Sequence, residues 1–154
     1  MAGRGDGESP AILPVEVPLI DEAPQVGIAT ARRIAAMNSR AVFLASSDLT
    51  HYGPAYRFAP AGTGLSGLAW AKDNDRRLLE QVERMQVEQV VGAVRANLNA
   101  CGGGAIAAML AACRELGASQ AVMLRHTNSY ETLLEQGIGH ERDNAVGYAS
   151  VVVG

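Results

Sequence analysis

Residues 41–53 read AVFLASSDLTHYG. The continuous apolar run over residues 41–45 is typical of a strand buried on both faces, as in a parallel sheet. This run ends abruptly in polar side chains between Ser46 and His51. Because ligand sites of open α/β sheets lie just beyond the carboxyl ends of the strands, we expect any chemistry of this chain at this junction.

Helical and strand patterns alternate along the rest of the sequence, which predicts an α/β fold. Apolar spacing and end signals predict helices over residues 21–37, 72–85, 87–98 and 105–116, the last one closed by Gly117. Strands are predicted over residues 121–124 and 145–153. Residues 12–20 carry two prolines and predict an edge strand or an extended entry segment. The residues after the apolar run, up to Gly67, predict a long loop, and residues 137–144 a polar connector.

Length and composition indicate one soluble globular domain over residues 12–154, preceded by a flexible leader over residues 1–11. The chain has 154 residues, of which 48% are hydrophobic and 19% charged, with a formal net charge of −3. This balance argues against a nucleic-acid surface, and no apolar stretch is long enough for a membrane span. Two cysteines without a secretion signal fit a reducing compartment, so we expect a cytoplasmic protein.

Asp48 and His51 form the first candidate site, since they lie three residues apart at the end of the predicted strand. Histidine transfers protons near neutral pH, and a neighbouring carboxylate can fix its tautomer. The alternative interpretation is a loop with an Asx turn and a surface histidine. A hydrolase triad with Ser46 or Ser47 fits poorly, because the G-x-S-x-G pattern of a nucleophile elbow is absent.

Cys101 opens the second candidate site, within the sequence CGGG at residues 101–104 before a predicted helix. Backbone amides at a helix N-terminus favour an anion, and a thiolate is both a nucleophile and a soft metal ligand. The alternatives are a helix-start turn with a small buried cysteine and a Gly-rich phosphate loop. The phosphate loop lacks the Lys and Ser/Thr of a P-loop.

The other cysteine and histidines carry weaker functional signals. Cys113 lies inside a predicted helix and is expected in the core. His126 follows a predicted strand among polar residues and could reach the same pocket, although a surface or hydrogen-bonded structural role is the stronger expectation. His140 lies in the polar connector and is expected to be solvated.

Residues 46–53, SSDLTHYG, resemble the S-[ST]-D-[LF]-x-H-[YW]-G motif of Memo-like proteins, a family that includes the AmmeMemoRadiSam system protein B group. Three further stretches match family segments in the expected order: DND at residues 73–75, NACGGGAI at 99–106 and GYASV at 147–151. The resemblance covers residues 12–153 and is to the C-terminal half of a family member.

This resemblance implies a fold and a site. The family is similar to the catalytic subunit of class III extradiol dioxygenases, which implies a three-layer α/β fold with a mixed sheet flanked by helices, equal to half of that catalytic domain. Those enzymes hold a non-haem Fe(II) with two histidines and a carboxylate. By resemblance, Cys101 takes the carboxylate's place as a metal ligand, and His51 is the acid/base residue with Asp48 beside it. Four further residues are expected to line the substrate pocket: Ser47, Tyr52, Asn99 and Gly102.

The family's two metal-binding histidines lie in the half that this chain does not match, and neither His126 nor His140 takes their place. We therefore expect a separate N-terminal-half chain or a homo-oligomer to complete the pocket, and a radical-SAM-system protein as a further candidate partner. The absent half should leave apolar sheet surface exposed. Three functions follow: an Fe(II)-binding, dioxygenase-like subunit, a non-catalytic interaction module, and a thiol-dependent enzyme using Cys101 and His51.

Overall fold

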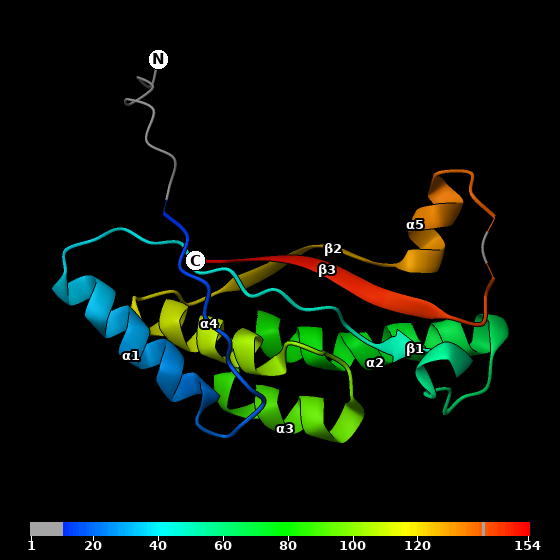
Figure 1. Ribbon diagram of the computed structural model, residues 1–154, viewed down its shortest axis with the longest axis horizontal. Helices are drawn as coiled ribbons and strands as arrows, with labels where there is room; N and C mark the ends of the chain where they lie inside the picture. The colour runs from blue at the N-terminus through cyan, green and yellow to red at the C-terminus, as the bar shows by residue number, and fades with distance from the viewer. Residues whose placement is uncertain (1–10, 140) are drawn as a thin grey trace, which may run out of the picture.

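The computed structural model describes residues 11–139 and 141–154. The expected leader lies outside these residues except for its last position, and so does the expected solvation of His140. Helices pack beneath a small antiparallel sheet with strand order β1-β3-β2 (Figure 1). The strands of this sheet are β1 (His51–Tyr52), β2 (Ala121–Asn128) and β3 (Ala145–Val153). The α/β class, with helices flanking a sheet, is therefore confirmed.

Figure 1 shows α2 (Gly64–Glu83) and α4 (Gly103–Glu115) directly beneath the strands. Helix α1 (Ala23–Ala36) packs on α4, and α3 (Val87–Asn97) packs on both α2 and α4. Two short elements complete the architecture: the 3-10 turn η1 (Pro54–Tyr56) and α5 (Ser129–Glu135). Within the described ranges, no helix is both long enough and apolar enough to cross a bilayer.

Most of the predicted helices and strands are present. Helices α1, α3 and α4 and strands β2 and β3 lie where the apolar patterns predict them. Gly117 has φ +100° just after α4, as expected of a helix-closing glycine. Helix α2 is longer than predicted and begins at Gly64, inside the predicted loop. Residues 12–20 form the extended entry segment and no strand.

The predicted buried strand over residues 41–45 is wrong. These residues belong to no strand, and Val42 and Leu44 are 95% and 90% exposed. The chain joins the sheet only from Leu49, whose N–H donates to the Gly147 carbonyl, and continues into β1. An apolar run becomes a buried strand only where neighbouring strands pair with it, and the described chain supplies none upstream of Leu49.

The core lies between the helices and the sheet. Its main cluster joins Leu78, Val90 and Leu110 to Leu49, directly next to the candidate site. Helices α1 and α4 approach closely because residue 27 is glycine: a Cβ there would lie 1.9 Å from the Ala108 carbonyl oxygen. A second cluster packs Tyr52 against α2. The polar junction at residues 46–51 is therefore anchored on both sides by packed residues.

Candidate functional site

Two segments far apart in sequence meet at the site, residues 46–51 and residues 99–102. The Ser47 hydroxyl accepts a hydrogen bond from the Gly102 N–H (2.9 Å) and donates one to the Asp48 carbonyl (2.7 Å). The backbones pass so closely that a Cβ on Gly102 would lie 2.5 Å from the Ser46 carbonyl oxygen. Glycine at position 102 is therefore needed for the approach, and Ser47 fastens the two segments together.

Asp48, His51 and Cys101 come together at this junction. One ligand atom from each lies within 4.8 Å of the other two. His51 Nε2 lies 3.4 Å from Asp48 Oδ2, and both side chains are partly exposed, at 38% and 49%. Cys101 is exposed as well. The structure thus unites the two candidate sites of the sequence into one accessible cluster.

The donor set fits a divalent metal ion. A thiolate, an imidazole and a carboxylate are ligands of zinc and of ferrous iron. Metal–ligand bonds of about 2.0–2.3 Å place ligand atoms roughly 3–4 Å apart around one ion. The spacing of at most 4.8 Å between these three ligand atoms is therefore within reach of small side-chain rotations.

Aromatic rings line one side of the cluster. The His51 ring lies 5.1 Å from the Tyr56 ring, centroid to centroid. Burial raises the pKa of the Tyr148 hydroxyl, and the negative charge of Asp48 and the neighbouring Tyr56 raise it further. Tyr148 therefore lies within electrostatic reach of the site. The sequence reasoning gave neither tyrosine a role, although Tyr148 belongs to the matching GYASV segment.

Asp75 supports the site from behind, and the sequence reasoning assigned it no role. Its Oδ1 accepts the Thr50 N–H (2.8 Å), and its Oδ2 lies 3.1 Å from His126 Nε2. The side chains of this pair are 2% and 4% exposed. A Cβ on Gly147 would lie 2.1 Å from Asp75 Oδ2, so β3 can pass this carboxylate only with glycine there. Of the two positions expected for His126, at the surface or in a hydrogen bond, the structure shows the second: the side chain is buried and bonded to Asp75.

Two buried asparagines continue this support. Asn74 donates from Nδ2 to the Thr50 hydroxyl (3.1 Å) and to the Asn97 carbonyl (2.9 Å). Asn99 donates from Nδ2 to the Asn74 carbonyl (2.9 Å). Helix α2 thereby fixes both segments of the site, one through Thr50 and the other through Asn99. The Asn99 side chain is fully buried in this network.

The structure separates Tyr52 from the cluster. Tyr52 follows His51 in β1, where successive side chains point to opposite faces of the strand. Its ring is fully buried in the second core cluster, and its hydroxyl donates to the carbonyls of Gly62 and Gly64. Cys113 is half-buried in α4, and burial raises the pKa of its thiol.

Comparison with known proteins places this geometry in a family. A family model described as Memo-like protein matches residues 8–152. A MEMO1 family protein of Methanosarcina mazei is 33% identical over 145 residues, which cover 92% of this chain and 47% of the relative. A MEMO1 family protein of Methanosarcina barkeri is 31% identical over 145 residues, 92% of this chain and 48% of the relative.

A third relative, from Methanocaldococcus jannaschii, is 34% identical over 135 residues, 86% of this chain and 40% of the relative. The chain thus spans about half the length of the curated relatives it matches. These matches confirm the resemblance first seen in the SSDLTHYG and NACGGGAI segments.

Proposed function

This chain belongs to the Memo-like protein family, and on that premise we propose that it is a metal-binding subunit related to class III extradiol dioxygenases. The observation that carries the proposal is the position of Cys101, the proposed ligand, in one accessible cluster with His51 and Asp48, where one donor atom of each residue lies within 4.8 Å of the other two. Further polypeptide completes the pocket, since the chain spans only about half the length of its relatives.

Cys101 is the metal ligand that this chain contributes. Its sulfur accepts the N–H of Asp48 at 3.3 Å, which holds the thiol in place beside the carboxylate. Cys101 also lies just before α4, so the start of that helix fixes its position. When bound, a divalent ion, Fe(II) in the first place, would supply Lewis-acid activation.

His51 is the residue that moves protons beside the metal. The Asp48 carboxylate oxygen Oδ2 lies 3.4 Å from His51 Nε2, and this contact favours one tautomer and one orientation of the ring. The ring packs against Tyr56 on another side, which limits its rotation. Asp48 therefore acts as a positioning residue, and the exposed face of His51 remains available to a substrate.

A three-ligand iron site needs two ligands in addition to Cys101. The partial exposure of His51, Asp48 and Cys101 leaves one side of the cluster open to residues of other polypeptide. A separate chain with the remaining half of the family sequence, or a second copy of this chain, would supply those ligands.

Anaerobic titration with Co(II) tests the ligand role of Cys101, because thiolate ligation gives cobalt a charge-transfer absorption. We expect a saturable absorption that Cys101→Ala abolishes and that Cys113→Ala, the matched change at the other free thiol, leaves intact. If the absorption survives Cys101→Ala, or forms neither in this chain alone nor in its complex with the unmatched part of the Methanosarcina mazei relative, the metal proposal fails.

The roles of the neighbouring residues are tested in the same titration. His51→Gln and Asp48→Asn should keep the cobalt absorption, because neither residue is the proposed ligand. An equal loss of absorption in His51→Gln and Cys101→Ala would instead make His51 a ligand and refute its role as a proton carrier.

A thiol-dependent enzyme is the second candidate function. It is favoured by the exposure of Cys101 and by the His51 ring nitrogen within 4.8 Å of its sulfur. In metal-free buffer, this function requires alkylation of Cys101 to slow markedly in His51→Gln. A chain with no cobalt absorption and no such dependence would be left with the third function, a non-catalytic interaction module.

A further inference from the structure

We infer that the groove between residues 41–47 and the C-terminal half of β3 is a slot for one β-strand, supplied by the polypeptide that corresponds to the unmatched part of the relatives. This inference rests on the proposed function only in requiring that further polypeptide. It assigns a docking surface, whereas the proposed function concerns the metal site. Residues 41–47 are called the strap.

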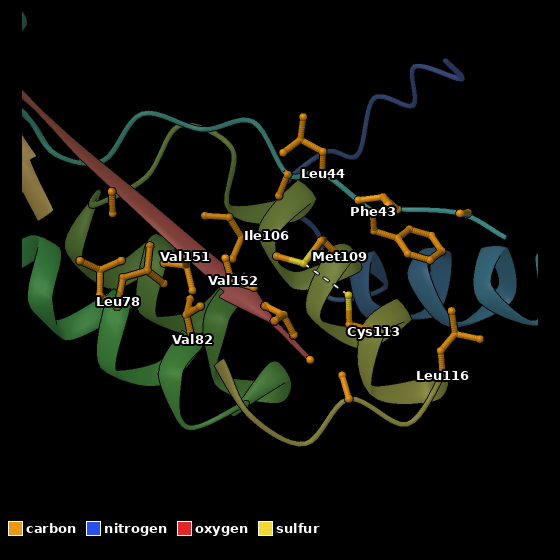
Figure 2. A pocket seen from close by; sticks show the side chains of 18 of the residues that line it. Phe43, Leu44, Leu78, Val82, Ile106, Met109, Cys113, Leu116, Val151 and Val152 are labelled. Atoms are coloured by element: carbon orange, nitrogen blue, oxygen red, sulfur yellow. Dashed lines mark hydrogen bonds between the residues drawn. The ribbon is translucent and has the colours of Figure 1, made fainter. Parts of the chain in front are cut away.

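The groove is a real hollow in the molecule, with a volume of about 700 Å³. Residues 41–45 of the strap form one wall, and the other is formed by Ala149 and residues 151–153 of β3, followed by Gly154. Figure 2 shows Phe43 and Leu44 on the strap, Val151 and Val152 on β3, and Ile106 and Met109 of α4 between them. Two extended segments therefore face each other across a gap floored by helices.

The backbones of both walls are unpaired where they face the gap. Across the described parts of the chain, the backbone groups of residues 41–47 form no hydrogen bond to any other residue. β3 pairs with β2 along one edge, but its other edge is paired only as far as Gly147, with β1 and Thr50. Two free strand edges on opposite sides of one groove form a template for an inserted strand.

The side chains of the strap have the pattern of a strand that lacks a neighbour. Val42 and Leu44 are almost fully exposed, whereas Phe43 and Ala45 are partly buried. Such alternation follows from an extended backbone, whose successive side chains point to opposite faces. At about 3.3 Å per residue, an inserted strand of six or seven residues would run the length of the strap.

The sheet face away from the helices is apolar as well. Val122 and Leu124 of β2 are 53% and 63% exposed, and Val152 of β3 is 56% exposed. The sequence predicts exposed apolar sheet surface for this chain, and these residues confirm it. Together with Val42 and Leu44, they give the incoming polypeptide an apolar face to cover after its strand has entered the slot.

The proposed occupant is a strand from further polypeptide, because only a strand can pair with the free backbone N–H and C=O groups on both walls of the groove. A small apolar molecule would contact the helices, but it would leave both rows of backbone N–H and C=O groups unpaired. Within residues 11–139 and 141–154, a second copy of this chain offers no spare strand apart from its own strap, which already forms a wall of its own groove. The other long extended segment, residues 11–20, packs on α4 with the Pro18 carbonyl close to Gly104.

The relatives are longer than this chain, and their unmatched part is the proposed source of the inserted strand. The Methanosarcina mazei relative is matched over only 47% of its length, so about as much chain again remains outside the match. We propose that one apolar strand of that remainder enters the slot, whether the remainder is joined to this chain or carried by another one. Its side chains toward the helices should be apolar, because the floor of the groove is formed by residues such as Leu78, Val82 and Ile106.

Hydrogen exchange tests the slot directly. The probe is the unmatched part of the Methanosarcina mazei relative, produced as a separate polypeptide and also co-expressed with the full chain. All steps use buffer with a chelator, so that metal binding plays no part. In the free chain, amides of residues 41–47 should exchange rapidly. In the complex, amides of the strap and of residues 149–153 should become protected together.

Charge substitutions give a second readout with a matched control. Leu44→Lys and Val152→Lys place a cation at the rim of the slot, on the apolar face that the incoming polypeptide covers, and both positions are exposed in the free chain, so folding should be retained. Each should weaken binding of the probe by about tenfold or more, since the charge would be buried. Leu134→Lys changes a leucine of α5 outside the groove whose exposure, 59%, is close to the 56% of Val152, and this variant should bind as the unmodified chain does.

Several outcomes would overturn the slot. They are failure of the probe to bind in both formats, binding without protection of the strap, and protection of the strap by self-association of the chain alone. Loss of binding in Leu134→Lys equal to that in Leu44→Lys would do the same. Each outcome is independent of the cobalt titration, so the slot can fail while the metal proposal stands, and the reverse.

Discussion

Asp48 and Cys101 exchange two hydrogen bonds across the site: the Asp48 N–H donates to the cysteine Sγ (3.3 Å), and the Cys101 N–H donates to the aspartate carbonyl (3.1 Å). The two residues lie 53 positions apart along the chain. The thiol is thereby fixed relative to the carboxylate by backbone groups, which move less than side chains do. This arrangement explains how an accessible cluster keeps a defined geometry.

Ser47→Ala should loosen this junction. The Ser47 hydroxyl partners the Gly102 N–H and the Asp48 carbonyl, and its loss leaves a part-buried N–H without a partner. We expect the free energy of unfolding to fall by about 1 kcal/mol in urea denaturation. Ser39→Ala is the control, because the Ser39 hydroxyl is exposed and, among the residues that the structure describes, makes a single long hydrogen bond, to the Met37 carbonyl. Equal stability of the two variants would contradict the role of Ser47.

Asp75→Ala should destabilise the protein far more than Asp73→Ala. Asp75 is buried and holds both Thr50 and His126, whereas Asp73 is exposed two positions earlier on the same helix. Removing the buried carboxylate leaves the Thr50 N–H and the His126 ring nitrogen unpaired, at a cost of about 2–4 kcal/mol.

The same urea experiment measures both variants. Stability of Asp73→Ala should be unchanged or slightly raised, because alanine is the better helix former. If both aspartates proved equally dispensable, Asp75 would not support the site.

Gly27→Ala and Gly92→Ala should shift stability in opposite directions. A methyl group at position 27 would overlap the Ala108 carbonyl and push α1 from α4. Nothing lies within 4 Å of a Cβ at position 92, which is inside α3. Alanine there should stabilise the helix by up to about 1 kcal/mol. Thermal unfolding followed by circular dichroism measures both, and a stable Gly27→Ala would refute the close helix contact.

Asp48→Asn should lower the pKa of Tyr148. Burial, the Asp48 carboxylate and Tyr56 all favour the neutral hydroxyl, so removal of one negative charge makes ionisation easier. The measurement is the ultraviolet titration of tyrosinate, with Tyr148→Phe identifying the signal. An unchanged titration in Asp48→Asn would place Tyr148 outside the field of the site.

The raised pKa of Tyr148 also has a consequence for stability. The unfolded chain releases this proton near the ordinary tyrosine pKa of 10.0, before the folded chain does. The contribution to folding is therefore fully present below about pH 10 and is lost as the pH rises through the folded value. Urea midpoints measured on both sides of that pH should fall less steeply in Tyr148→Phe.

Local sequence determined much of this protein. The helices α1, α3 and α4 and the strands β2 and β3 follow from apolar spacing and helix-end signals, because these patterns act over neighbouring residues. Asp48, His51 and Cys101 were marked by their chemistry and by family motifs. The end of α4 was marked by Gly117. Membership of the Memo-like family was readable from the same motifs.

Tertiary structure alone decided the rest, because the deciding contacts join residues distant in sequence. Asp75 became a support of the site only when folding brought it to Thr50 and His126. Tyr52, although it follows His51, was directed into a separate core cluster by the pleat of β1. The apolar run at residues 41–45 has the composition of a buried strand, but it can become one only where another strand of the fold pairs with it. The described chain leaves that run unpaired beside an open groove, where the sequence alone had placed a strand.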